Sequence, residues 1–166
     1  VLDRTLEAIS HVPGRRICLS PRGRRFDQAF AKELAHEPGV VLVCGRYEGI
    51  DQRVIEAREM EEVSLGDFVL TGGEIAAQAL LDATVRLLPG VIGSEQGLDE
   101  ESFEDGLLEY PQYTHPKIWK GRSVPEVLLS GNHKKIAEWK KQQSELVTRN
   151  YRPDLWEAYE GVKVQI

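Results

Sequence analysis

The sequence predicts an α/β protein with a mostly parallel sheet, plus a small helical C-terminal domain. Two observations favour this fold. Short apolar runs alternate with amphipathic segments and with glycine- or proline-containing turns in the first part of the chain, an order typical of parallel sheets. A polar, acidic stretch then interrupts the pattern, and a basic helical segment follows it. We therefore expect an α/β domain at residues 1–92, a flexible linker at 93–107 and a helical domain at 108–166.

The start of the chain has the pattern of an amphipathic helix. Leu2, Leu6 and Ile9 share one helical face, so residues 1–9 are predicted to be helical. This pattern has no visible start, and Val1 is not a methionine. We therefore expect the chain to have been cut from a longer protein.

The next elements alternate between strand and helix. Residues 16–19 predict a short buried strand, ended by a turn over residues 20–23. A helix is expected over residues 27–35. Five consecutive apolar residues at 40–44 fit a parallel strand that is buried on both faces. A glycine-flanked loop and a helix over residues 51–57 come next.

The remaining elements carry capping signals. A short strand is expected at residues 63–65, and Thr71 with Glu74 forms a capping-box pattern before a helix over residues 73–88. Asn132 is a candidate cap for the basic helix expected over residues 134–146. Two adjacent apolar rows predict the buried face of the 73–88 helix: Ile75, Ala79, Ala83 and Leu87, and Ala76, Leu80 and Leu88.

Composition places the chain among ordinary globular proteins, with 41% apolar and 29% charged residues. No apolar run reaches the roughly 18 residues of a membrane span, so no membrane association is expected. Cys18 and Cys44 each lie in a short apolar run, which predicts buried, reduced thiols and a cytoplasmic location. A disulfide or a metal-binding pair is the alternative, although no CxxC motif accompanies these cysteines.

The charge distribution is uneven. The formal net charge is -6, and the segment at residues 100–109 is strongly acidic, but Lys and Arg dominate residues 134–152. Arg22, Arg24 and Arg25 form a second basic cluster. Such clusters either form a solvated face or bind phosphates, so nucleic acid remains a candidate partner despite the acidic total.

Five motifs follow one another over about residues 20–154. They are Leu19-Ser20-Pro21-Arg22-Gly23, Val43-Cys44-Gly45-Arg46-Tyr47-Glu48-Gly49-Ile50-Asp51, Ser64-Leu65-Gly66-Asp67-Phe68-Val69-Leu70-Thr71-Gly72-Gly73-Glu74, Tyr113-Thr114-His115-Pro116 and Leu128-Leu129-Ser130-Gly131-Asn132-His133. In this order they resemble the signatures of the bacterial tRNA (guanine-N1)-methyltransferase family known as TrmD, of the SPOUT class. The resemblance implies methyl transfer from S-adenosylmethionine to N1 of the guanosine at tRNA position 37, which lies 3′ of the anticodon. It also implies a deep trefoil knot, a homodimer, a C-terminal domain that grips tRNA, and roughly 70 further family residues before Val1.

The glycine-rich loops are the candidate cofactor site. Glycines let backbone N–H and C=O groups approach a ligand closely, although they also simply make tight turns. Both loops follow predicted parallel strands, so both should lie at the carboxyl edge of the sheet, where ligands collect. The resemblance implies that S-adenosylmethionine contacts Pro21, Gly45, Tyr47, Glu48, Leu65, Gly66, Asp67, Phe68, Val69, Leu70, Gly72 and Gly73.

Two further residues are catalytic candidates. N1 of guanine carries a proton at neutral pH, so a base must remove it, and negative charge then develops on O6. The resemblance assigns these roles to a linker carboxylate, here Glu101 where the family has Asp, and to Arg86. Asp99 is an alternative base, a solvated acidic linker is the alternative role for Glu101, and an ion pair with Asp82 is the alternative role for Arg86.

A metal site is not predicted, since the histidines lack ligand spacing. Glu48 and the acidic linker nevertheless make Mg²⁺ a candidate ligand. The Glu at the position of the base and the missing N-terminal segment also leave a second function open. This alternative is a non-catalytic fragment that binds the cofactor or tRNA.

Overall fold

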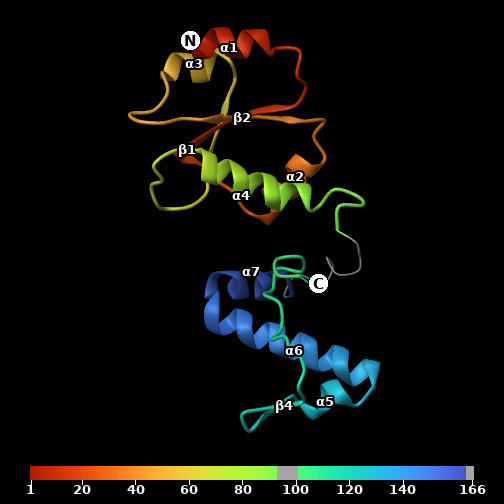
Figure 1. Ribbon diagram of the computed structural model, residues 1–166. Helices are drawn as coiled ribbons and strands as arrows, with labels where there is room; N and C mark the ends of the chain where they lie inside the picture. Colours follow the sequence, from red (N-terminus) through yellow and green to blue (C-terminus); the bar gives the residue numbers. More distant parts are fainter. Residues whose placement is uncertain (93–100, 164–166) are drawn as a thin grey trace. The chain divides into compact units, whose positions relative to one another are not determined.

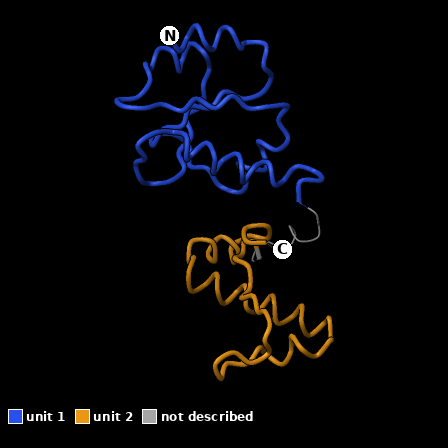
Figure 2. The backbone as a smooth tube through the Cα atoms, in the orientation of Figure 1, with its two compact units in different colours: residues 1–93 blue, residues 94–166 orange. Residues whose placement is uncertain are grey.

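The computed structural model describes residues 1–92 and 101–163 of the chain. It divides into two compact units, Val1–Gly93 and Ser94–Ile166, which we describe separately (Figures 1 and 2). Over the described residues, no helix has both the length and the apolar character needed to cross a membrane. The segment expected to be a linker lies partly outside the described residues. Its end, residues 101–107, forms turns in the second unit, and the flexibility of the linker stays a prediction.

Unit 1 is built on a three-stranded sheet in the order β2-β1-β3. The strands are β1 (Arg15–Arg25), β2 (Val40–Cys44) and β3 (Glu61–Ser64). Both pairings are parallel, with Ile17 of β1 opposite Leu42 of β2 and Glu61 of β3. The predicted α/β class with a parallel sheet is therefore confirmed.

Helices cover both faces of this sheet (Figure 1). Successive side chains of a strand point to opposite faces, and Ile17 and Cys18 accordingly enter different cores. Cys18 packs with residues of α1 (Leu2–Ala8) and α3 (Gln52–Ala57), while Ile17 packs with residues of α2 (Gln28–Ala35) and α4 (Glu74–Val85). The predicted helices at residues 1–9, 27–35 and 51–57 are confirmed.

The turn predicted at residues 20–23 is wrong. Strand β1 runs through this segment, and an irregularity between Leu19 and Arg24 places both of them opposite Val63 of β3. The Pro21 ring and a following glycine suggested a turn, but a strand can absorb extra residues as a bulge without ending. Gly23 lies so close to β3 that an added Cβ would overlap the backbone of Glu62 and Val63.

The predicted capping box at the start of α4 is also wrong. Gly73 is the N-cap, and none of the described side chains caps this helix. The Glu74 carboxylate instead accepts a hydrogen bond from Arg46 Nε at 2.7 Å. Of the two apolar rows, Ala76 and Leu80 are buried, whereas Ile75 in the other row is 62% exposed.

Only one of the two cysteines is buried as predicted. Both thiols are free, and Cys18 is buried as predicted, but Cys44 is exposed. Cys44 ends β2, which lies at one edge of the three-stranded sheet and is only partly covered. The prediction that β2 is buried on both faces is wrong for the same reason.

Unit 2 is mainly helical. It contains α5 (Glu126–Leu129), α6 (His133–Tyr151) and α7 (Pro153–Lys163), together with a hairpin of β4 (Ile118–Trp119) and β5 (Arg122–Ser123). The fully buried Thr148 of α6 anchors the start of the unit, because its Oγ1 accepts a hydrogen bond from the Leu108 N–H at 2.8 Å. The predicted basic helix is confirmed but extends to Tyr151.

The predicted cap of α6 is confirmed, since the Asn132 side chain accepts a hydrogen bond from the Lys135 N–H at 3.2 Å. We expect Asn132→Ala to lower the free energy of unfolding by about 1 kcal/mol, because a helix N–H then loses its partner. Urea unfolding followed by circular dichroism measures this change. Asn132→Asp, which keeps an acceptor, is the matched control. Equal midpoints for the two variants would contradict the role of the cap.

Candidate functional site

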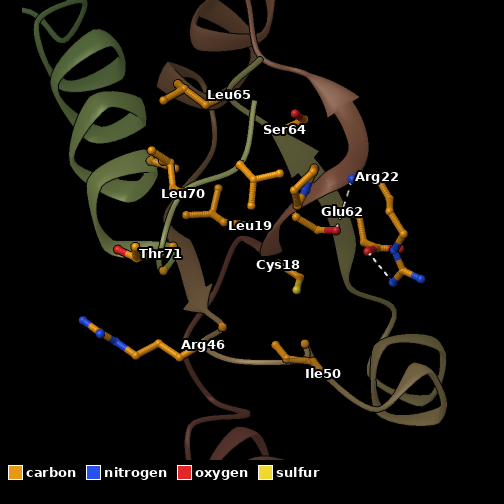
Figure 3. Close-up of a pocket in the computed structure, with 18 of the residues that line it drawn as sticks. Cys18, Leu19, Arg22, Arg46, Ile50, Glu62, Ser64, Leu65, Leu70 and Thr71 are labelled. Carbon is orange, nitrogen blue, oxygen red and sulfur yellow. Dashed lines mark hydrogen bonds and ion pairs between the residues drawn. The ribbon is translucent and has the colours of Figure 1, made fainter. Parts of the chain in front are cut away.

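A cavity of about 420 Å³ lies in unit 1 at the carboxyl ends of its strands (Figure 3). Leu19 of β1, Gly45 after β2, and Ser64 at the end of β3 all line it. The carboxyl ends of parallel strands are where ligands bind in open α/β sheets. The prediction that the glycine-rich loops after β2 and β3 meet at this edge is confirmed.

The two loops are joined directly to each other. Arg46 and Gly72 form an isolated β-bridge, and the Gly73 N–H donates to the Gly45 carbonyl at 3.1 Å. The Arg46–Glu74 ion pair adds a side-chain link between the same loops. The backbone N–H of Glu74 itself, followed by the Arg46 guanidinium, holds the pKa of the Glu74 carboxyl below its usual range.

Glycine is required at some positions of this cavity and not at others. A Cβ on Gly73 would lie 2.8 Å from the Cys44 Cα, closer than real Cβ atoms approach. A Cβ on Gly45 would lie 3.6 Å from Ile50, which is ordinary contact. Close backbone packing therefore explains Gly73, whereas a Cβ at Gly45 would fit without displacing a neighbour, so packing does not explain the glycine there.

Most of the expected cofactor-binding residues line this one cavity. Gly66 and Asp67 do not: Asp67 is exposed, and Gly66 lies in a tight turn, where the Ser64 Oγ donates to its carbonyl at 3.0 Å. Tyr47 is fully exposed and has a left-handed backbone with φ 61°, which costs a non-glycine residue roughly 1–2 kcal/mol. The lining residues among those expected are Pro21, Gly45, Tyr47, Glu48, Leu65, Phe68, Val69, Leu70, Gly72 and Gly73.

Sequence reasoning missed a charged pair on the cavity wall. Arg22 of β1 and Glu62 of β3 form an ion pair at 2.8 Å (Figure 3). Arg22 also donates to the Gln52 side chain at 3.3 Å. Burial, followed by the charge of Glu62, raises the pKa of the neighbouring Cys18 thiol. The sequence places Arg22 in a basic cluster with Arg24 and Arg25, for which a solvated face and phosphate binding are both open. No local pattern in the sequence links Arg22 to a carboxylate forty residues away.

The basic cluster around Arg22 is largely neutralised within the unit. Arg24 pairs with Glu33 at 3.0 Å, and its guanidinium lies 4.4 Å from the centre of the Phe30 ring. Because Arg22 and Arg24 both have carboxylate partners, the cluster presents less positive charge than the sequence indicates.

The two catalytic candidates lie in different units. Arg86 is the half-buried C-cap of α4 and is not among the residues that line the unit 1 cavity. Glu101 is in unit 2, where it lines a second cavity of about 740 Å³ together with Lys140 and Lys141. Asp99, the alternative base, lies outside the described residues. Their roles stay predictions.

Metal binding also stays a prediction. Within residues 1–92 and 101–163, no group of three or more His, Cys, Asp or Glu side chains is placed to hold a metal ion. Part of the acidic linker considered for Mg²⁺ lies outside these residues.

The fold and the cavity define a class of protein: an α/β domain with a cavity at the carboxyl edge of a parallel sheet, followed by a helical unit. The family model for tRNA (Guanine-1)-methyltransferase TrmD matches residues 1–158, and the chain belongs to this family. The resemblance drawn from its motifs is thereby confirmed.

Three relatives support the assignment, each named tRNA (guanine-N(1)-)-methyltransferase. The protein from Ruegeria pomeroyi is 62% identical over 89% of this chain and 60% of its own length. The Bartonella tribocorum protein is 57% identical over 95% of this chain and 69% of its own length. The Rhodospirillum rubrum protein is 54% identical over 100% of this chain and 70% of its own length. The chain thus spans 60% to 70% of the length of these relatives.

Proposed function

We propose that the protein transfers a methyl group from S-adenosylmethionine to N1 of the guanosine at tRNA position 37. The observation that carries this proposal is the cavity built from two joined glycine-rich loops, in a chain that belongs to a family named for tRNA guanine-N1 methylation. The activity, the methyl donor and the nucleotide are all part of the proposal.

The residues around the cavity suit the methyl donor. Its volume of about 420 Å³ is within the range of small-molecule sites. Apolar side chains such as Leu65 and Leu70 can enclose an adenine, while the backbone at Gly45 and Gly72 offers polar groups that no Cβ shields. The bound cofactor would supply an electrophilic methyl group.

Two side chains would handle the substrate. Glu101 would accept the N1 proton of guanine, which frees the nitrogen lone pair for attack on the methyl carbon. Arg86 would stabilise the negative charge that this step places on O6. Glu101 reaches one methylene further than the Asp of the family, so its backbone must sit further from the base.

We further propose that the chain forms a deep trefoil knot, works as a homodimer in the cytoplasm and contacts tRNA through the basic helix α6. Family membership supports the knot, and the lysines on exposed positions of α6 support contact with phosphates. Exposed apolar side chains on and after α4 support the dimer, because their contact with solvent is unfavourable. They are Ile75, Leu81, Val85, Leu88 and Val91.

A single-turnover assay tests the proposed function. The protein as its cell makes it is mixed in excess with labelled S-adenosylmethionine and a tRNA transcript that has guanosine at position 37. We expect label at N1 of that guanosine, and none when adenosine replaces it. Label on another atom or at another position would contradict the proposed substrate.

The second candidate function is a protein that binds the cofactor or tRNA without catalysis. The observation that favours it is Glu101, at the position where the family has Asp. Calorimetry with S-adenosylmethionine, run beside the assay, separates the two. Cofactor binding without any methyl transfer would establish this alternative and exclude the enzyme.

A further inference from the structure

The hairpin of β4 and β5 has a defined geometry. Ile118 pairs with Ser123, and Trp119 pairs with Arg122, across a turn of two residues. Lys120 and Gly121 both have left-handed backbones, with φ 49° and 77°, as in the turns that match the twist of a hairpin. The Val124 N–H donates to the Lys117 carbonyl at 2.9 Å and closes the base. The hairpin therefore holds its side chains in fixed places.

Burial in a hydrophobic core does not explain why this hairpin carries the aromatic residue Trp119. Every residue at 111–123 is exposed, and Trp119 is 56% exposed. The other tryptophans have aromatic neighbours within the unit: Trp139 lies 6.4 Å from Tyr110, and Trp156 lies 5.7 Å from Tyr159. Partial burial and ring packing therefore account for those two rings, but not for Trp119.

The charge around Trp119 is uniformly positive. Lys117, Lys120 and Arg122 lie in the segment 110–125, which contains no Asp or Glu, although the whole chain carries a net charge of -6. The Lys120 Nζ lies 5.0 Å from the centre of the Trp119 ring. An exposed ring beside cations is the combination that binds an unpaired nucleotide, since the ring stacks on the base and the cations meet its phosphates.

We infer that the β4–β5 hairpin is an RNA-contact surface on which Trp119 stacks against an unpaired base of the tRNA substrate. Lys117, Lys120 and Arg122 contact the flanking phosphates. The inference rests on the proposed function, which supplies tRNA as the substrate, and adds a stacking contact outside the basic helix α6. Because every base offers a flat face, this contact adds affinity with little base preference.

Binding of a tRNA transcript across a salt series, measured by fluorescence anisotropy, tests the stack. Because Trp119→Leu removes one base–aromatic stack, we expect it to weaken tRNA binding by about tenfold at each salt concentration. Trp119→Phe, which keeps an aromatic face, should retain most of the affinity. Ile118→Ala is the control in the same hairpin: Ile118 is 63% exposed but has no aromatic face, so its loss should change affinity less than about twofold.

The salt dependence separates stacking from charge. Trp119→Leu should leave the slope of log affinity against log salt unchanged, whereas Lys120→Gln should reduce it by about one. Cofactor affinity should be the same in all variants, since the cofactor cavity is in unit 1. Circular dichroism and unfolding midpoints report whether each variant keeps its fold.

Three outcomes would overturn the inference. If the unaltered protein binds and methylates tRNA but Trp119→Leu binds equally well, the stack is absent while the proposed function stands. If Trp119→Phe is as weak as Trp119→Leu, the ring acts through local packing and not through stacking. A protein that neither binds nor methylates tRNA would overturn the proposed function itself, and the inference with it.

Discussion

Glu101→Gln is expected to lower the single-turnover rate of methyl transfer by at least about a hundredfold, with no change in cofactor affinity. The amide has nearly the shape of the carboxylate but cannot take the N1 proton of guanine, so the nitrogen lone pair stays unavailable. Cofactor binding should be spared, because Glu101 is not among the residues that line the proposed cofactor cavity. Rapid-quench assays give the rate, and calorimetry gives the cofactor affinity.

Three further variants test whether the loss of rate is specific to the Glu101 carboxylate. Asp105→Asn changes an exposed carboxylate that lines the same second cavity, and it should keep the unaltered rate. Glu101→Asp should retain transfer, because it keeps the carboxylate and only shortens the side chain. Asp99→Asn examines the alternative base. An active Glu101→Gln beside an inactive Asp99→Asn would show that Asp99 removes the proton.

The elements that sequence reasoning predicted best are those specified by neighbouring residues. The apolar run at Val40–Cys44 indicates a strand on its own, and β2 has those bounds. Asn132 accepts a hydrogen bond from the N–H three residues later, as the predicted cap requires, and Asp27 makes the same contact at the predicted start of α2. Local patterns were sufficient here because the partners are close in the chain.

The errors arose where a distant partner decides the conformation. Thr71 and Glu74 have the spacing of a capping box, but Arg46 of the other loop binds the Glu74 carboxylate. Cys44 lies in an apolar run, yet it ends an edge strand and is exposed. The hairpin of β4 and β5 has a different cause, which is local. Its turn, Lys120-Gly121, lacks the Asn or Asp that usually indicates a two-residue hairpin, so the sequence does not predict these strands.

The candidate site also has a part that neighbouring residues specify and a part that depends on residues far apart in the sequence. Its glycine-rich loops are contiguous in sequence, and both could be assigned to the carboxyl edge because each follows a parallel strand. The Arg22–Glu62 pair could not be predicted from the sequence, since it joins residues of two different strands, β1 and β3. The bulge that brings Arg22 to this position was mistaken for a turn, because composition alone does not distinguish a bulge from the end of a strand.

Gly23→Ala is expected to lower the free energy of unfolding by about 3 kcal/mol, the largest stability effect that we predict for unit 1. An added Cβ would overlap the backbone of Glu62 and Val63, and two backbones cannot relieve this by rotating a side chain. Strands β1 and β3 must therefore separate, which also displaces the Arg22–Glu62 pair from the cavity wall. Cofactor affinity should fall together with stability.

Gly45→Ala is the matched control, because it adds the same methyl group to another glycine of unit 1, one whose surroundings can accept it. Its Cβ would meet Ile50 at 3.6 Å, so the free energy of unfolding should change by less than about 1 kcal/mol. Urea unfolding followed by circular dichroism compares the two variants. Similar midpoints would mean that β1 and β3 are not in close contact at Gly23. A large loss for Gly23→Ala alone would instead show that glycine is needed there for strand packing, and not for a turn.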